Sequence, residues 1–106
     1  MIYDNEKRWA NGYDQTEMKA YRDFGQEFQS AIKGGHALLP TNKATTVRVR
    51  NDKRLMTDGP FAETKEQLSG YYLVDAIDLD RATEIAPKIP GARYGSVEVR
   101  PIMVFS

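Results

Sequence analysis

The sequence predicts an α+β fold in which an antiparallel sheet carries two helices on one of its faces. Two observations lead to this prediction. Segments with the two-residue alternation of strands and segments with the three- and four-residue spacing of helices follow one another in the order β-α-β-β-(turn)-β-α-β. A strand–helix–strand unit occurs in both halves of the chain. This order matches the ferredoxin-like, or split β-α-β, plan β-α-β-β-α-β.

Size and composition limit the function classes. The chain has 106 residues, which predicts a single domain over residues 1–106, and 41% hydrophobic residues are enough to build a core. Fifteen basic and fifteen acidic residues give a net charge of +0, so we expect no nucleic-acid partner and no anionic membrane partner. No apolar run approaches the ~20 residues of a membrane span. We therefore expect a cytoplasmic protein.

Residue types also restrict metal and redox chemistry. The chain has no cysteine and a single histidine, which excludes disulfides, thiolate catalysis and a histidine-rich metal site within one chain. No glycine-rich phosphate loop, nucleophile elbow or metal-spaced cluster is present. We expect neither a metal nor a cofactor.

The first predicted elements are a very short strand at residues 1–3, which resembles the end of a longer apolar strand, and a polar loop to Tyr13. Asp14 is a helix N-cap residue, and Glu17 completes a capping-box pattern. Apolar residues then recur at helical spacing, which predicts an amphipathic helix to about Lys33; they are Met18, Tyr21, Phe24, Phe28 and Ile32. We expect the glycine pair at positions 34 and 35 to end this helix.

The middle of the chain predicts a hairpin. Residues 36–40 are a short apolar segment, interpreted as a strand fragment or an extended entry. From residue 44 the sequence alternates, with Val47 and Val49 on one face and Arg48 on the other, as in a half-buried strand. Residues 51–53 form a turn, and residues 54–57 return as the second arm.

A corner follows the hairpin. Asp58 and Gly59 favour a turn, and Pro60 suits the first position of a helix, so we expect one or two helical turns within residues 62–68, with Phe61 buried as an anchor. Residues 70–76 predict a strand, Asp78 predicts the N-cap of a second helix, and residues 94–105 predict a last alternating strand.

The predicted sheet leaves one face without helices. Apolar residues on that face need a partner, and a symmetric homodimer is the simplest one. We therefore expect a homodimer.

Several stretches resemble the DGPF-type branch of the YCII-related family. They are residues 44–48 (ATTVR), 57–66 (TDGPFAETKE), 70–73 (GYYL), 89–90 (IP) and 95–101 (GSVEVRP). The resemblance covers nearly the whole chain and implies a dimeric α+β barrel, in which two ferredoxin-like sheets pack face to face. Some relatives are thought to use a histidine of the first helix with an aspartate. Residues 18–32 contain no histidine, so that dyad does not carry over.

Asp58 and His36 are the candidate catalytic residues. Asp58 could act as a general base at the mouth of a cavity, or it could simply accept backbone N–H bonds in its turn. His36 is the only side chain expected to titrate near neutrality, but a histidine after two glycines is also common as a surface residue at a helix end.

Arg48, Tyr72 and Glu63 are the candidate ligand-binding residues. Arg48 could bind an anionic group, or it could form a cross-strand ion pair on a wet face. One of Tyr71 and Tyr72 is expected in the core, with the other offering its hydroxyl to a pocket. Glu63 could face a cleft, although a solvated helix surface is the simpler explanation.

Three functions remain open. The first is an uncharacterised dimeric domain that binds a small organic ligand, with an anionic group if an arginine contacts it, in a barrel pocket. The second is an acid–base lyase or isomerase that uses Asp58 and His36. The third is a purely structural or regulatory interaction module. The sequence does not decide whether the protein is an enzyme.

Overall fold

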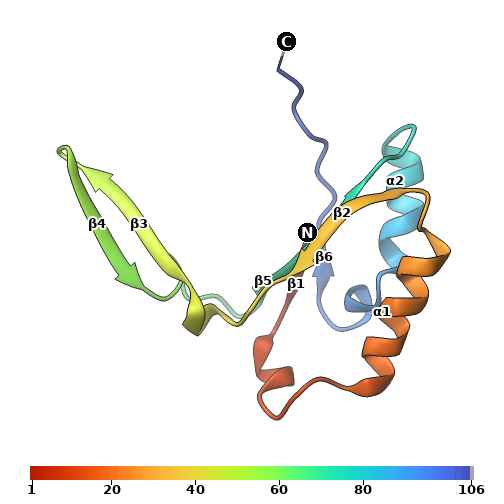
Figure 1. The fold of residues 1–106 in the computed structure, drawn as a ribbon, viewed down its shortest axis with the longest axis horizontal. Helices are drawn as coiled ribbons and strands as arrows, with labels where there is room; N and C mark the ends of the chain where they lie inside the picture. The colour runs from red at the N-terminus through yellow and green to blue at the C-terminus, as the bar shows by residue number, and fades with distance from the viewer. Residues whose placement is uncertain (106) are drawn as a thin grey trace.

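A computed structural model describes residues 1–105 and confirms the α+β, ferredoxin-like class. The main sheet is antiparallel with strand order β2-β5-β1-β6, where the strands are β1 (Ile2–Asp4), β2 (Ile32–Ala37), β5 (Gln67–Val74) and β6 (Ser96–Val97). Helices α1 (Gln15–Glu27) and α2 (Leu79–Ile85) lie on the same side of this sheet (Figure 1). The hydrophobic core between the two helices and the sheet contains Ile2, Phe24, Phe28, Ile85 and Ile89.

The predicted hairpin is confirmed, but it stands apart from the main sheet. Its strands β3 (Thr45–Arg50) and β4 (Lys53–Asp58) pair only with each other among the described residues and project away from the body (Figure 1). Asn51 and Asp52 both have positive φ, 53° and 62°, as a type I′ hairpin turn requires. The expected half-burial is wrong for the single chain, because Val47 is 54% exposed and Val49 61%.

The predicted end of the first helix is wrong, because its last residues belong to strand β2. Helix α1 ends at Glu27 rather than near Lys33, and β2 begins at Ile32. The glycine pair lies inside β2, where a side chain on Gly35 would meet the backbone: its Cβ would lie 2.5 Å from the carbonyl oxygen of Tyr71. Gly35 therefore permits close approach to β5 and does not end a helix. His36, in consequence, lies in a strand.

The helical turns predicted after the hairpin are also wrong. Residues 62–66 form bends and irregular coil rather than helical turns, and β5 begins at Gln67. The expected anchor, Phe61, is 78% exposed. Without buried contacts, a helix of one or two turns does not recover the cost of its first hydrogen-bonded turn.

The last strand is much shorter than predicted. Only Ser96 and Val97 pair with β1, whereas a strand to residue 105 was expected. Beyond the contact of Glu98 with Met1, no described strand lies beside the chain. Residues 99–105 leave the body as an extended segment, which we call the tail (Figure 1).

The overall shape reflects these two projections. The radius of gyration is 16.0 Å, whereas a compact chain of this length has about 13 Å. Among the described helices, none has the length and apolar run that would let it span a membrane.

Candidate functional site

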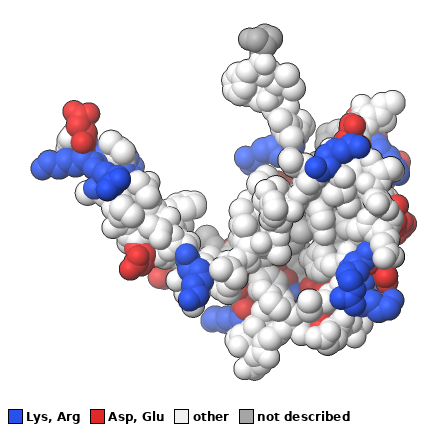
Figure 2. All heavy atoms as spheres, viewed as in Figure 1, with Lys and Arg blue, Asp and Glu red and all other residues white. Residues whose placement is uncertain are grey.

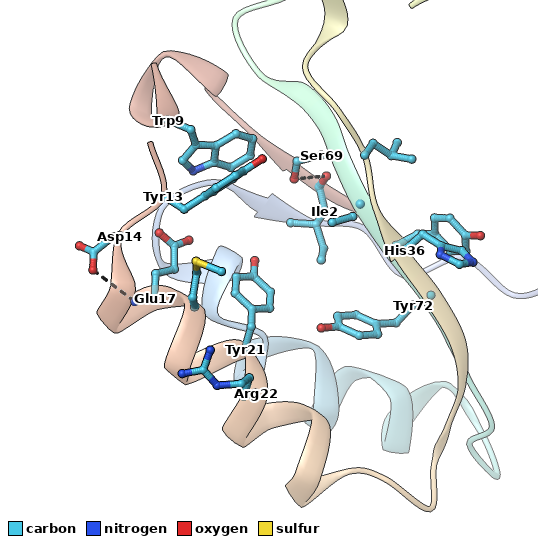
Figure 3. Close-up of a pocket in the computed structure, with 16 residues that line it drawn as sticks. Ile2, Trp9, Tyr13, Asp14, Glu17, Tyr21, Arg22, His36, Ser69 and Tyr72 are labelled. Atoms are coloured by element: carbon cyan, nitrogen blue, oxygen red, sulfur yellow. Dashed lines mark hydrogen bonds between the residues drawn. The ribbon is translucent and has the colours of Figure 1, made fainter. Parts of the chain in front are cut away.

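A cavity of about 510 Å³ lies between α1 and the sheet. Its walls come from α1, from the loop before it, and from β2 and β5 (Figure 3). The lining is mainly apolar and aromatic, with Trp9, Tyr13, Tyr21 and Tyr72 as its rings. Such a lining, with a few polar groups, is typical of sites for small organic molecules.

An ion pair with a buried carboxylate holds Glu17, which lines the cavity, in place. Asp4, at the end of β1, is 1% exposed, and its Oδ2 accepts a hydrogen bond of 2.6 Å from Nη2 of Arg8. The same Nη2 lies 3.0 Å from Oε1 of Glu17 on α1. The hydrogen bond from Arg8 to Asp4 is the largest influence on Arg8 and raises its pKa above the ordinary value. Arg8 thus fixes the loop to α1 and shares its single positive charge between Asp4 and Glu17.

The first turn of α1 orients the side chains that face the cavity. Oδ1 of Asp14 accepts hydrogen bonds from the backbone N–H of Thr16 at 2.7 Å and of Glu17 at 3.4 Å, which confirms it as the N-cap. The side chain of Glu17 bonds to Arg8, so the reciprocal half of the expected capping box is wrong. Glu17 and Tyr21 are four residues apart and therefore share one helix face.

Two tyrosines project into the space between α1 and the sheet (Figure 3). Burial, with the nearby Glu17 and Tyr72 as smaller causes, raises the pKa of Tyr21 to about 12. Burial also raises the pKa of Tyr72. Both phenols are therefore neutral near pH 7 and can donate a hydrogen bond to a ligand. Tyr72 thus lines the cavity, and its role in binding a ligand stays a prediction.

Aromatic rings close the outer end of the cavity. The centroids of Trp9 and Tyr13 are 5.9 Å apart with a tilt of 39°. Trp9 is half-buried, whereas Tyr13 is 55% exposed, so Tyr13 lies at the mouth. Flat apolar surfaces of this kind can pack against a ring.

His36 borders the cavity, but its ring lies on the other side of the sheet. The ring packs edge-on to Tyr71, with centroids 5.9 Å apart (Figure 3). In β5 the neighbouring Tyr72 points to the opposite face, toward the helices, because side chains alternate along a strand. His36 is thus placed to serve the uncovered face of the sheet rather than the cavity.

The other candidates lie outside the cavity. Asp58 ends β4 and is paired with Thr45, Arg48 lies on β3, and Glu63 lies in the irregular segment before β5; all three are exposed. The carboxylate of Asp58 accepts no hydrogen bond from the described residues, so the expected backbone bonds in its turn are not formed. A catalytic role for Asp58 and His36 stays a prediction, and the two do not share a cavity within one chain.

The sequence reasoning missed several residues of the cavity. Trp9 was expected only as part of a loop, and Tyr21 only as a core residue. The available signal was the spacing of Tyr13, Glu17 and Tyr21, which repeats every four residues as one stripe of a helix does. Within residues 1–105, no group of three or more His, Asp or Glu side chains is arranged to hold a metal ion.

Comparisons with known proteins agree with the resemblance. The model of a family described as "YCII-related domain" matches residues 2–106. An uncharacterised protein of Rhizobium meliloti (strain 1021) is 38% identical over 112 residues, which cover 99% of this chain and 90% of that protein.

Proposed function

The chain belongs to the YCII-related domain family, and we propose that this member binds a small organic acid in the cavity between α1 and the sheet. The observation that carries the proposal is an aromatic cavity of about 510 Å³ with an arginine at its edge. Cavities of roughly 300 to 1,000 Å³ are the usual size for small-molecule sites.

One basic side chain at the cavity is free to bind an acid. Glu17 is already paired with Arg8, and Asp14 already caps α1. Arg22, one helical residue after Tyr21, also lines the cavity and is exposed (Figure 3). Among the described residues it has no carboxylate within ion-pair distance. Its guanidinium can therefore bind a ligand carboxylate while the tyrosine hydroxyls donate to other acceptor atoms.

A thermal-shift and calorimetric titration with three matched probes tests the proposal. The probes are benzoate, benzamide and benzylamine, which share a ring and differ in charge. We expect benzoate to stabilise the protein most. Arg22→Gln should weaken benzoate binding about fivefold, because an exposed charge pair contributes up to ~1 kcal/mol, and should leave benzamide binding unchanged.

Arg93→Gln is the matched control, since Arg93 is also exposed but does not line the cavity. Equal binding of the three probes, or no binding of any of them, would contradict the proposal. Loss of benzoate binding in the Arg93 variant would point to a general charge effect instead.

We also propose that the domain works as a homodimer. The support is apolar surface that the single chain leaves open: Leu68 and Leu73 on β5, and Val47, Val49 and Met56 on the hairpin are all exposed. The dimeric barrel implied by the family resemblance would cover such surface.

A further inference from the structure

The floor of the cavity between α1 and the sheet is nearly bare backbone. Gly35 and Ala37 of β2 and Gly70 of β5 line it, and Gly70 is the strand partner of Ala37. The rings of the neighbouring His36 and Tyr71 lie on the other face, because side chains alternate along a strand (Figure 3). Glycines inside a strand often mark a place where a ligand approaches the backbone closely. A floor without large side chains suits a planar group.

Two tyrosine side chains that line the same cavity are held in place by packing. A Cβ on Gly91, in the 3₁₀ turn Pro90–Arg93, would lie 2.7 Å from Oη of Tyr21, so this turn approaches the hydroxyl closely. The ring of Tyr72 packs on Phe24 of α1, with centroids 5.2 Å apart. Both hydroxyls are therefore positioned before a ligand binds, which lowers the entropy cost of binding.

The two hydroxyls are neighbours and are free to donate. Figure 3 shows the hydroxyl of Tyr72 pointing toward Tyr21. After burial, which is the main cause, the nearby Tyr72 also raises the pKa of Tyr21, as only a close group does. Among the described residues, only Tyr3 has a phenolic hydroxyl that donates a hydrogen bond. A carbonyl oxygen has two lone pairs and can accept from two donors, so the pair forms a site for one carbonyl oxygen.

We propose that the ligand is an aromatic keto acid, whose ring lies on the bare floor and whose ketone oxygen accepts hydrogen bonds from Tyr21 and Tyr72. This assignment rests on the proposed binding of an organic acid and adds the ring and the ketone to it. Both phenols are neutral near pH 7 and donate, and a ketone oxygen only accepts. Trp9 and Tyr13 supply aromatic surface for the ring, and Arg22 is left for the carboxylate.

Two pairs of acids of nearly equal shape test the ketone contact. The acids with a ketone are 3- and 4-acetylbenzoate, and their counterparts without an acceptor are 3- and 4-isopropylbenzoate. We expect the better acetyl acid to bind about tenfold more tightly than its isopropyl counterpart, the usual effect of two neutral hydrogen bonds. Calorimetric titration of the protein gives both affinities.

Removal of the hydroxyls assigns the effect to the two tyrosines. Tyr21→Phe and Tyr72→Phe should each reduce the acetyl preference about threefold, and the double variant should abolish it. The isopropyl acid should bind no more weakly to these variants, because each keeps its ring. Tyr3→Phe is the matched control, since Tyr3 is half-buried on β1 but does not line the cavity. The ¹³C resonance of a labelled ketone should move downfield on binding, and less so in the Tyr21 and Tyr72 variants.

The outcomes separate the ketone from the acid. Equal binding of the acetyl and isopropyl acids, or an acetyl preference that survives in the double variant, would overturn the ketone contact and leave the acid site in place. If 4-acetylbenzamide bound as tightly as 4-acetylbenzoate and still depended on both hydroxyls, the preference for an acid would be wrong and the ketone contact alone would stand. Failure of every probe to bind would overturn both.

Discussion

Asp4 is a carboxylate that the fold buries almost completely and that has one ion-pair partner; its Oδ1 also accepts a hydrogen bond from the backbone N–H of Asn5. Its side chain is 2% exposed, and Arg8 is its ion-pair partner. Removing one member of a buried pair leaves the other as an uncompensated charge, which costs much more than the loss of an exposed pair. Arg8 also lies over the ring of Tyr94, 4.1 Å from its centroid.

We therefore predict that Arg8→Met lowers the free energy of unfolding by about 3 kcal/mol. Lys19→Met is the matched control, because it breaks the exposed pair with Asp23 and should cost less than ~1 kcal/mol. Urea unfolding at pH 7 measures both. Equal effects of the two substitutions would show that the burial of Asp4 does not govern the pair.

Tyr21, which lines the cavity, should make the free energy of unfolding depend on pH in alkaline solution. Its pKa is about 12 in the folded protein, against 10.0 ordinarily, and burial is the main cause. The folded state thus holds the phenolic proton more tightly than the unfolded state does. The resulting stabilisation is complete below pH 10 and is lost as the pH rises toward 12.

We predict that the free energy of unfolding falls between pH 10 and pH 12 by less in Tyr21→Phe than in the wild type. Tyr13→Phe, which changes an exposed tyrosine of the same cavity, should keep the wild-type decrease. Urea midpoints across this range give the comparison. A parallel decrease in the wild type and in Tyr21→Phe would contradict the assignment to Tyr21.

At the scale of elements, a glycine in α1 and a glycine in β2 are expected to respond in opposite ways to a side chain. Gly25 lies inside α1, and a Cβ built on it would meet no atom within 4 Å. Gly35 lies in β2 with φ of 156°, and its Cβ would lie 2.5 Å from the carbonyl oxygen of Tyr71 and 3.0 Å from the ring of Tyr72.

We predict that Gly25→Ala raises the free energy of unfolding by about 0.5 to 1 kcal/mol, the usual gain of alanine over glycine in a helix. Gly35→Ala should lower it by ~2 kcal/mol, because the backbone of β5 cannot move aside easily. Thermal or urea unfolding measures both signs. A stabilising Gly35→Ala would mean that β2 and β5 are not held this closely.

Gly35 also illustrates why the sequence predicted the type of each element more accurately than the residues at which it ends. α1, α2, the hairpin and the antiparallel class follow from local spacing and caps, which the sequence shows directly. The end of α1 was misplaced because Ile32 falls four residues after Phe28 and so continues a helical spacing, although it belongs to β2. Gly35 is a glycine because of contacts with β5, which come from tertiary structure.

The cavity could be predicted only in part for a related reason. A strand places adjacent side chains on opposite faces, so one of Tyr71 and Tyr72 could be expected to point toward the helices. Trp9 reaches the cavity only because Arg8 fixes its loop to Asp4 and Glu17, and such contacts have no local pattern. Asp58 and Arg48 were attractive candidates by type, but the hairpin carries them away from the body.

At the scale of the whole molecule, the hairpin is the feature that a single chain explains least. A two-stranded hairpin is at best marginally stable alone in water, since it lacks a third strand or a helix to pack on. Here β3 and β4 have no third strand among the described elements, and Val47 and Met56 form an exposed cross-strand pair on one face. Lys and Arg side chains gather toward its tip (Figure 2). Packing of the apolar face on a second copy would supply the missing contacts.

We therefore predict that hydrogen exchange in the hairpin depends on protein concentration. Amides of β3 and β4 should exchange slowly in concentrated solution and faster on dilution, because the monomer leaves the hairpin exposed. Amides of α1 around the buried Phe24 should not change, since their protection comes from the core of one chain. Met56→Lys should speed hairpin exchange at high concentration, while Leu39→Lys, at a comparably exposed site outside the hairpin, should not. Hairpin protection that stays constant across dilution would show that β3 and β4 are stable without a partner, and the dimer would then need another contact surface.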